Sequence, residues 1–172
     1  MASMFLLLTY TIISGVYVLF NNSYNVFLRF FAIILIAVAG YMSFKRDTFL
    51  SFLGISFMPN TLILAEKIPQ GANIDYVLDM TGYDNGTRVV YWAANKTGKI
   101  VEDPFEAYKD FHNAGVAIVS NNKAIIKVFC PDKYMVSHFG VHTSTLDKHF
   151  HYRIVFKETG MMSPVMTAKL NC

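Results

Sequence analysis

The first 44 residues contain a single charged side chain, Arg29. Apolar sequence runs from Met4 to Phe20 and again from Val26 to Phe44, and the polar stretch 21–25 separates the two runs. About 20 helical residues at 1.5 Å each cross the hydrocarbon core of a bilayer, and about 17 still suffice. Neither run carries the polar stripe of an amphipathic surface helix. We therefore predict a transmembrane α-helical hairpin over residues 1–46, with both of its ends on one side of the membrane.

Two other interpretations of this region stay open. Residues 1–20 are also compatible with a cleaved signal peptide, although no Lys or Arg precedes the apolar run and a second run follows at once. A hairpin buried inside a soluble domain is the other alternative, although a chain of 172 residues has little else to cover it. Lys45 and Arg46 weakly indicate, by the positive-inside rule, that the rest of the chain faces the cytosol.

The composition changes after the apolar runs. Apolar residues make up 53% of the chain and charged residues 16%, against about 45–50% and about 25% in soluble domains. Residues 47–61 are still largely apolar but contain Gly54 and Pro59, and because proline cannot continue a helix we predict an interfacial linker there. Residues 62–172 have the composition of an ordinary soluble domain. A net charge of +3 without a Lys/Arg-rich run argues against a nucleic-acid partner.

Short β-rich segments alternate with turn signals throughout residues 62–172. This spacing predicts a mainly β domain, an antiparallel β-sandwich of about seven or eight strands. Asp103 as N-cap and Pro104 at the first helical position predict one short helix in a loop. Cys130 and Cys172 permit one disulfide without requiring it, so the redox compartment stays open. The predicted strands cover residues 62–66, 74–80, 87–93, 115–119, 124–130, 150–156 and 165–170.

His149 and His151 are the residues most suggestive of chemistry. In a strand their side chains share one face, which Arg153 continues, whereas the apolar residues 150, 152, 154 and 156 form the other face, expected in the core. Two imidazoles so spaced can reach one metal ion. With Tyr134 they form a candidate metal site, and His138 and His142 lie nearby in the sequence. A hydrogen-bonded structural cluster is the alternative interpretation.

A family resemblance bears on this site. The segment 124–134, with its Pro-x-x-Tyr turn, and the following His149-Phe150-His151 resemble the iron-binding segment of intradiol ring-cleavage dioxygenases. That family is a β-sandwich in which two tyrosines and two histidines bind ferric iron. The resemblance implies that Tyr134 is one tyrosine ligand and that His149 and His151 are the two histidine ligands.

The chain departs from that family at two positions. Ile100 stands where the resemblance places the other tyrosine ligand, and Leu146 stands where it places an arginine beside the substrate. An alkyl side chain cannot replace a phenolate ligand. We therefore expect no ring cleavage and assign no catalytic residue.

A second resemblance, over roughly residues 50–162, is to a group of proteins from large DNA viruses of algae and protists. In such viruses an internal membrane lies beneath an icosahedral capsid, and small membrane-anchored proteins tie the two together. The resemblance implies a minor capsid protein in the inner membrane of the virion, and in host membrane during assembly. Its partners would be the lipid bilayer and other capsid proteins, major and minor. The motifs that carry it are Tyr91–Ala94, Asp103-Pro104 with Ala107-Tyr108, Asn113–Ala117, Pro131-x-x-Tyr134 and His149-x-His151-Tyr152-Arg153.

Three functional hypotheses follow. The first is a membrane-anchored structural protein without a cofactor, which tethers a capsid shell to a membrane through its β-sandwich. The second is a membrane-bound metal-binding or dioxygenase-like enzyme that holds iron or zinc at Tyr134, His149 and His151. The third is a receptor or adhesin outside the cell, which would use the glycosylation sequons at Asn21, Asn85 and Asn95.

Overall fold

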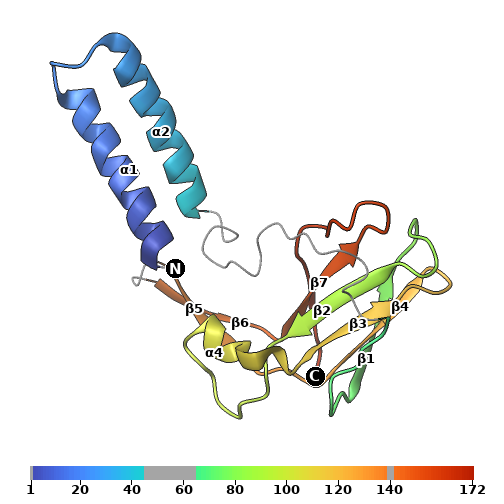
Figure 1. Cartoon of the computed structure of the whole chain (residues 1–172). Coiled ribbons are helices and arrows are strands. Elements are labelled where there is room, and N and C mark those ends of the chain that lie inside the picture. The colour runs from blue at the N-terminus through green and yellow to red at the C-terminus, as the bar shows by residue number, and fades with distance from the viewer. Residues whose placement is uncertain (1, 45–64, 139–141) are drawn as a thin grey trace. The chain divides into compact units, whose positions relative to one another are not determined.

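The computed structural model describes residues 2–44, 65–138 and 142–172. The predicted linker at 47–61 and most of the predicted strand at 62–66 lie outside the described residues. The chain divides into two compact units, one with two helices and one with a mainly β domain (Figure 1).

The first unit, Met1–Gly54, contains the helices α1 (Ala2–Phe20) and α2 (Val26–Phe44). The two helices pack against each other. At Gly15 the approach is so close that a Cβ atom would lie 2.7 Å from Cγ1 of Ile36. The prediction of two N-terminal helices is confirmed. Within the described residues α2 is long and apolar enough to cross a membrane, whereas the apolar stretch of α1 is shorter.

The turn between the helices satisfies its polar groups locally. The side-chain oxygen of Asn25 accepts a hydrogen bond from the Leu28 backbone N–H at 3.0 Å and so caps the start of α2. The Arg29 guanidinium donates to the Asn21 carbonyl at 3.1 Å and to Oδ1 of Asn22 at 3.2 Å. The charge of α2 is therefore held at the polar turn, at the end of the helix pair.

The second unit, Ile55–Cys172, forms antiparallel sheets from eight strands in its described part. The strand β4 pairs with β1, the strands β3-β2-β7-β8 form a four-stranded sheet in that order, and β5 pairs with β6. The strands are β1 (Ile74–Asp79), β2 (Arg88–Ala93), β3 (Ala114–Ile118), β4 (Lys123–Val128), β5 (Tyr134–His138), β6 (His142–Leu146), β7 (His149–Val155) and β8 (Met166–Lys169).

Most strand predictions after residue 73 agree with these bounds to within two residues. The strands β5 and β6 were not predicted, because polar residues such as Ser137, Thr143 and Ser144 break the apolar alternation there. The short helix α4 (Pro104–Ala107) begins as predicted: Asp103 caps it by accepting a hydrogen bond from the Phe105 N–H.

One hydrophobic cluster joins the β1–β4 pair to the four-stranded sheet. The alternation of β4 shows how it forms. Ala124, Ile126 and Val128 are fully buried, whereas Ile125 between them is 51% exposed, because successive side chains of a strand point to opposite faces. Phe150, from the middle of the other sheet, is also fully buried in this cluster.

Strand β7 differs from the prediction in one respect. Phe150 and Ile154 lie in the core as expected, but Phe156 follows the end of the strand and is 40% exposed. The opposite face is not open to solvent either, since His149, His151 and Arg153 are all buried. A second layer therefore covers the histidine face of β7.

Tyr91 and Gly115 fit together across the β2–β3 pair. The Tyr91 hydroxyl donates to the Lys67 carbonyl at 3.3 Å, and a Cβ atom at position 115 would overlap both of these oxygen atoms. Gly115 thus leaves the space that the phenol occupies. Burial raises the pKa of Tyr91 to about 12.

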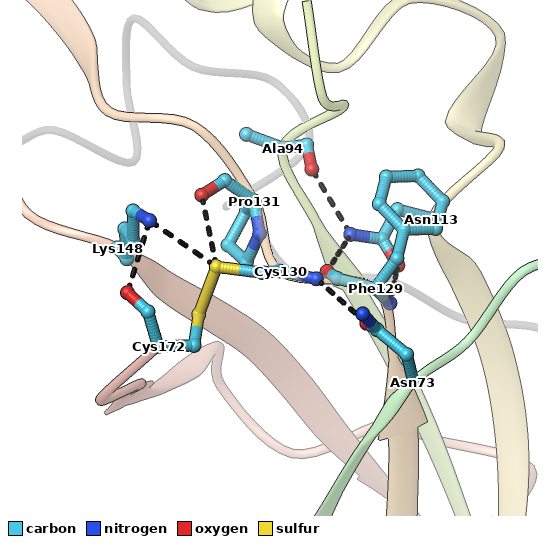
Figure 2. The surroundings of a disulfide bond; sticks show 8 residues. All are labelled: Asn73, Ala94, Asn113, Phe129, Cys130, Pro131, Lys148 and Cys172. Carbon is cyan, nitrogen blue, oxygen red and sulfur yellow. Dashed lines mark hydrogen bonds between the residues drawn. A yellow bond between two sulfur atoms is a disulfide. The ribbon is translucent and has the colours of Figure 1, made fainter. Parts of the chain in front are cut away.

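The end of the chain is fixed by a disulfide between Cys130 and Cys172, whose Cα atoms are 6.0 Å apart (Figure 2). The Lys148 ammonium donates to the Cys172 carbonyl at 3.0 Å and lies 3.2 Å from Sγ of Cys130. The Leu170 N–H donates to the Lys148 carbonyl. The last residues are thereby tied both to the end of β4 and to the loop before β7.

Beside the disulfide, Asn113 joins the ends of two strands (Figure 2). Its side-chain amide donates to the carbonyls of Ala94 at 3.0 Å and Phe129 at 2.9 Å, and its oxygen accepts from the Phe129 N–H at 3.1 Å. Asn113 is fully buried. Its side-chain amide pairs with backbone groups just beyond the ends of β2 and β4, as a neighbouring strand would.

Reduction of the disulfide should lower the stability of the β domain by about 4 kcal/mol, because the bond closes a loop of 42 residues in the unfolded chain. Urea unfolding of the full chain in detergent, with and without dithiothreitol, measures the effect. The only tryptophan, Trp92, lies in β2 and reports on this domain alone. The double variant Cys130→Ser/Cys172→Ser should match the reduced protein and not respond to dithiothreitol. Coincident curves for oxidised and reduced wild type would contradict the expectation.

Candidate functional site

The two histidines of β7 lie side by side in the interior. His149 is 7% exposed and His151 is 2% exposed, and their ring centroids are 4.8 Å apart. They share one strand face, as their spacing predicts.

Tyr134 comes to His149 from another strand. It begins β5, is 2% exposed, and its hydroxyl lies 3.1 Å from Nε2 of His149. The backbone holds it there, because Val101 forms a β-bridge with Tyr134 and accepts a hydrogen bond from the Met135 N–H at 2.8 Å. The structure thus brings together Tyr134, His149 and His151, the three residues of the predicted metal site.

A further residue, Tyr108, belongs to the same cluster. Its side chain is 2% exposed. Its hydroxyl lies 3.0 Å from the Tyr134 hydroxyl and 3.4 Å from Nε2 of His149, and its ring centroid is 5.9 Å from that of His151. Tyr108 was not predicted to belong to the site. The one sequence feature that could have pointed to Tyr108 is its position directly after the predicted helical turn. The sequence does not show in which direction that turn carries the Tyr108 side chain.

The position of Tyr108 is set by α4 and by Asn95. Tyr108 is the C-cap of α4, and its N–H donates to the Pro104 carbonyl at 3.0 Å. Asn95 donates a hydrogen bond on either side of Tyr108: its backbone N–H donates to the Ala107 carbonyl at 2.8 Å and its side-chain amide donates to the Lys109 carbonyl at 2.6 Å. The phenol of Tyr108 is therefore presented by an anchored turn.

Both histidines use Nδ1 for bonds to the surrounding protein. Nδ1 of His149 bonds the backbone carbonyl of Asp147, and Nδ1 of His151 lies 2.8 Å from the Thr167 hydroxyl. The carbonyl requires the proton of His149 to be on Nδ1, which makes Nε2 of a neutral ring the atom with the free lone pair. Nε2 of His149 meets the two phenols, and Nε2 of His151 is buried. Histidines that bind metals through Nε2 commonly have such an Nδ1 partner.

The donor atoms have the spacing of metal ligands. The Tyr108 oxygen, the Tyr134 oxygen and Nε2 of His149 form a triangle with sides of 3.0, 3.1 and 3.4 Å. Ligands at about 2.0–2.1 Å from one ion are about 2.8–3.4 Å from each other in octahedral and tetrahedral geometry. Imidazole and phenolate ligands suit iron, and imidazole also suits zinc. The same distances are those of ordinary hydrogen bonds, so the cluster is equally satisfied as a structural network.

Among the described side chains, no group of three or more His, Cys, Asp and Glu is placed to hold a metal ion. A metal at His149 and His151 would therefore depend on the tyrosine oxygens.

The loop before β7 is fixed from outside the cluster. The Lys133 ammonium bonds the Asp147 carboxylate at 2.8 Å, and this pair holds the pKa of Asp147 below its usual range. Because folding lowers the pKa of Asp147, the Lys133–Asp147 pair stabilises the folded domain at pH values above the pKa that Asp147 has in the unfolded chain. This stabilisation is lost as the pH falls through the pKa of Asp147 in the folded domain. The pair links the residue before Tyr134 to the residue whose carbonyl bonds His149.

The other residues singled out in the sequence lie elsewhere. Ile100 is 54% exposed, so it does not take part in the buried cluster. Leu146 pairs with Tyr134 across β5–β6 and is partly buried. His138 and His142 are paired at the end of the same two strands, and their side chains lie outside what the structure describes.

The asparagines of the sequons are used within the fold. The side-chain amide of Asn95 donates to the Lys109 carbonyl and Asn95 is only partly exposed, whereas Asn85 is exposed and its side-chain oxygen accepts a hydrogen bond from the Asn121 N–H. Glycosylation at Asn95 would break a contact that positions Tyr108.

Comparisons of the chain with protein-family models, with curated proteins and with solved structures found no match. What the chain does must therefore be inferred from its own residues.

Tyr134→Phe should destabilise the metal-free domain by about 1–3 kcal/mol, because it removes a buried hydroxyl that bonds both Tyr108 and His149. Unfolding of the full chain followed by Trp92 fluorescence gives the change. Tyr83→Phe, at an exposed turn, is the matched control and should stay within about 0.5 kcal/mol of wild type. Equal stabilities for the two variants would mean that the cluster contributes nothing to folding.

Proposed function

We propose that the chain is a membrane-anchored structural protein, in which α1 and α2 form a transmembrane hairpin that holds the β domain at the bilayer surface. The observation that carries this proposal is the exposure of large apolar side chains around both helices. Burial of one such side chain stabilises a protein by about 1.5–3 kcal/mol, and in this proposal the lipid buries them. The exposed apolar side chains are Leu6, Leu7, Tyr10, Ile13, Val16, Tyr17 and Phe20 on α1, and Val26, Phe27, Leu28, Phe30, Phe31, Ile33, Ile34, Leu35, Val38, Tyr41 and Phe44 on α2.

The helix pair has the dimensions of a bilayer hairpin. Each helix has 19 residues, about 28 Å at 1.5 Å per residue, close to the thickness of the hydrocarbon core. Contact at Gly15 and burial of Ala32 and Ala39 match the small residues that line helix contacts in membranes. Arg29 reaches the polar turn, where it would lie among the lipid headgroups.

The β domain is proposed to act as a β-sandwich that docks onto protein partners. The β1–β4 pair and the four-stranded sheet share one core, which supports this architecture. Together with the resemblance to proteins of large DNA viruses, the anchor favours a minor capsid protein. Its sandwich would tether the capsid shell to the inner membrane of the virion, with major and minor capsid proteins as partners.

Flotation of the expressed chain with liposomes tests the anchor. Full-length protein should rise with the lipid and should remain there after a carbonate wash, since two transmembrane helices are not displaced by salt or high pH. Deletion of residues 1–46 should leave the β domain in the bottom fractions. A full-length protein that stays soluble without detergent would rule out the anchor.

A second candidate function is metal binding at Tyr134, His149 and His151, specifically favoured by the Nδ1 bonds of the two histidines. In this proposal the histidines supply nitrogen ligands from β7 and Tyr134 supplies an oxygen ligand from β5. Iron or zinc bound there would supply Lewis acidity or, with iron, redox chemistry. The protein residues hold the ligand atoms in place and keep solvent away.

The variant His149→Ala/His151→Ala tests this candidate. Wild-type protein purified in detergent should bind close to one iron or zinc ion per chain by elemental analysis, and the double variant should bind less than a tenth of that. His112→Ala, at an exposed histidine outside the cluster, is the matched control and should retain full metal content. Metal-free wild type after exposure to both ions would leave only the structural role of the cluster.

A further inference from the structure

The two sides of the disulfide differ in exposure and in charge. Cys172 is exposed, whereas Cys130 is only partly exposed and the Lys148 ammonium lies 3.2 Å from its Sγ (Figure 2). We propose that this disulfide is a thiol–disulfide exchange site with a fixed direction. An incoming thiolate bonds to Sγ of Cys172, and Cys130 leaves as a thiolate beside Lys148. This reaction is separate from the proposed anchor and from the proposed metal site.

The first argument is access to the two sulfur atoms. Exchange depends on which sulfur of a disulfide the attacking thiolate can reach. Asn171 and Cys172 are both exposed. Sγ of Cys130 instead lies against protein, with the Pro131 carbonyl at 3.8 Å and the Lys148 ammonium at 3.2 Å. Attack from solvent is therefore directed to Cys172.

The second argument is the charge beside the leaving sulfur. A positive charge next to a cysteine sulfur stabilises its thiolate, and a more stable thiolate leaves a disulfide faster. In the part of the chain that the structure describes, Lys148 forms no ion pair with an Asp or Glu side chain. The adjacent Asp147 carboxylate is paired with Lys133 at 2.8 Å. The charge of Lys148 therefore acts on the sulfur of Cys130.

The third argument is that the bond can open without disturbing the core. Cys130 is held by its backbone N–H, which donates to Oδ1 of Asn73 at 3.3 Å. The Lys148 carbonyl accepts a hydrogen bond from the N–H of the buried Leu170 at 3.0 Å. These bonds do not involve the disulfide, so they keep Cys130 and Lys148 together after it opens. Only the two exposed residues after Leu170 are released.

The full reaction consumes two thiols. In the first exchange, the electron pair of the incoming thiolate forms a bond to Sγ of Cys172, and the electron pair of the old bond leaves with Cys130. A second thiolate then attacks the incoming sulfur and releases Cys172, which takes a proton from water. Two thiols are oxidised to one disulfide, and the disulfide of the protein is reduced. A small thiol and the cysteine of another protein supply the same chemistry.

The direction of exchange is tested with 2-mercaptoethanol, a neutral thiol that the charge of the protein does not attract. The oxidised full chain in detergent is mixed with it, the reaction is stopped with acid at early times, and mass spectrometry locates the adduct. At least about ten times as much adduct should be on Cys172 as on Cys130, because access and leaving group favour the same direction. An even distribution, or a preference for Cys130, would overturn the proposal.

The role of Lys148 is tested by the rate of the same reaction. Lys148→Gln keeps a hydrogen-bond donor but removes the charge, and it should open at least about threefold more slowly than wild type. Lys148→Arg restores the charge and should react within about twofold of wild type. Lys123→Gln, at an exposed lysine that begins β4, is the matched control for a lost charge and should react as wild type does. Equal rates for Lys148→Gln and wild type would show that the charge has no part in the exchange.

Reduced thioredoxin, a protein dithiol, distinguishes the source of the thiolate. Opening by both reagents would support a protein thiol as the partner, and opening by 2-mercaptoethanol alone would support small thiols. Trp92 fluorescence verifies that the β domain stays folded during the reaction. A folded chain whose disulfide opens with neither reagent would overturn the exchange site and leave the anchor and the metal site untouched.

Discussion

The constraint on which the β domain depends is that β7 is buried on both faces. Phe150 and Ile154 enter the hydrophobic core, while His149 and His151 are covered on the opposite side. A strand in that position must satisfy every polar side chain internally, because an unpaired buried group costs about 1–3 kcal/mol. Tyr108, directly after α4, and Tyr134 on β5 provide partners for His149, and Thr167 on β8 provides one for His151. The segments that cover the histidine face of β7 therefore carry the polar groups that the two histidines need as partners.

The same requirement explains how the cluster is held in place. Its members come from segments far apart in the sequence, and each segment is fixed by bonds of its own: a cap and Asn95 for Tyr108, a β-bridge for Tyr134, and a backbone carbonyl for His149. The disulfide then closes the stretch that contains Tyr134 and both histidines. Such preorganisation suits a ligand site and a purely structural network alike, and what separates them is whether an ion is held at the centre.

The helical unit obeys a different constraint. The side chains of α1 and α2 are apolar on nearly every face, and their one charged residue, Arg29, bonds the polar turn. The proposed transmembrane position fits this surface, because a helix pairs most of its backbone polar groups within itself and can therefore cross lipid. The proposed anchor and the proposed site are independent of one another: the first needs only apolar length, and the second needs a folded β domain.

The sequence by itself determined the two N-terminal helices, the mainly β character of the rest and most strand positions, because apolar length and alternation are local properties. It also placed His149 and His151 on one face, which follows from the period of a strand. It did not reveal β5 and β6, whose residues are too polar to show a pattern, nor the pairing of Cys130 with Cys172. The family resemblance aligned Ile100 with a tyrosine ligand, and Ile100 is exposed, whereas nothing in the sequence indicated that Tyr108 lies against Tyr134 and His149. Only the tertiary structure showed where Tyr108 lies. The direction of the short capped turn before it depends on what the turn packs against, and no local sequence pattern records that.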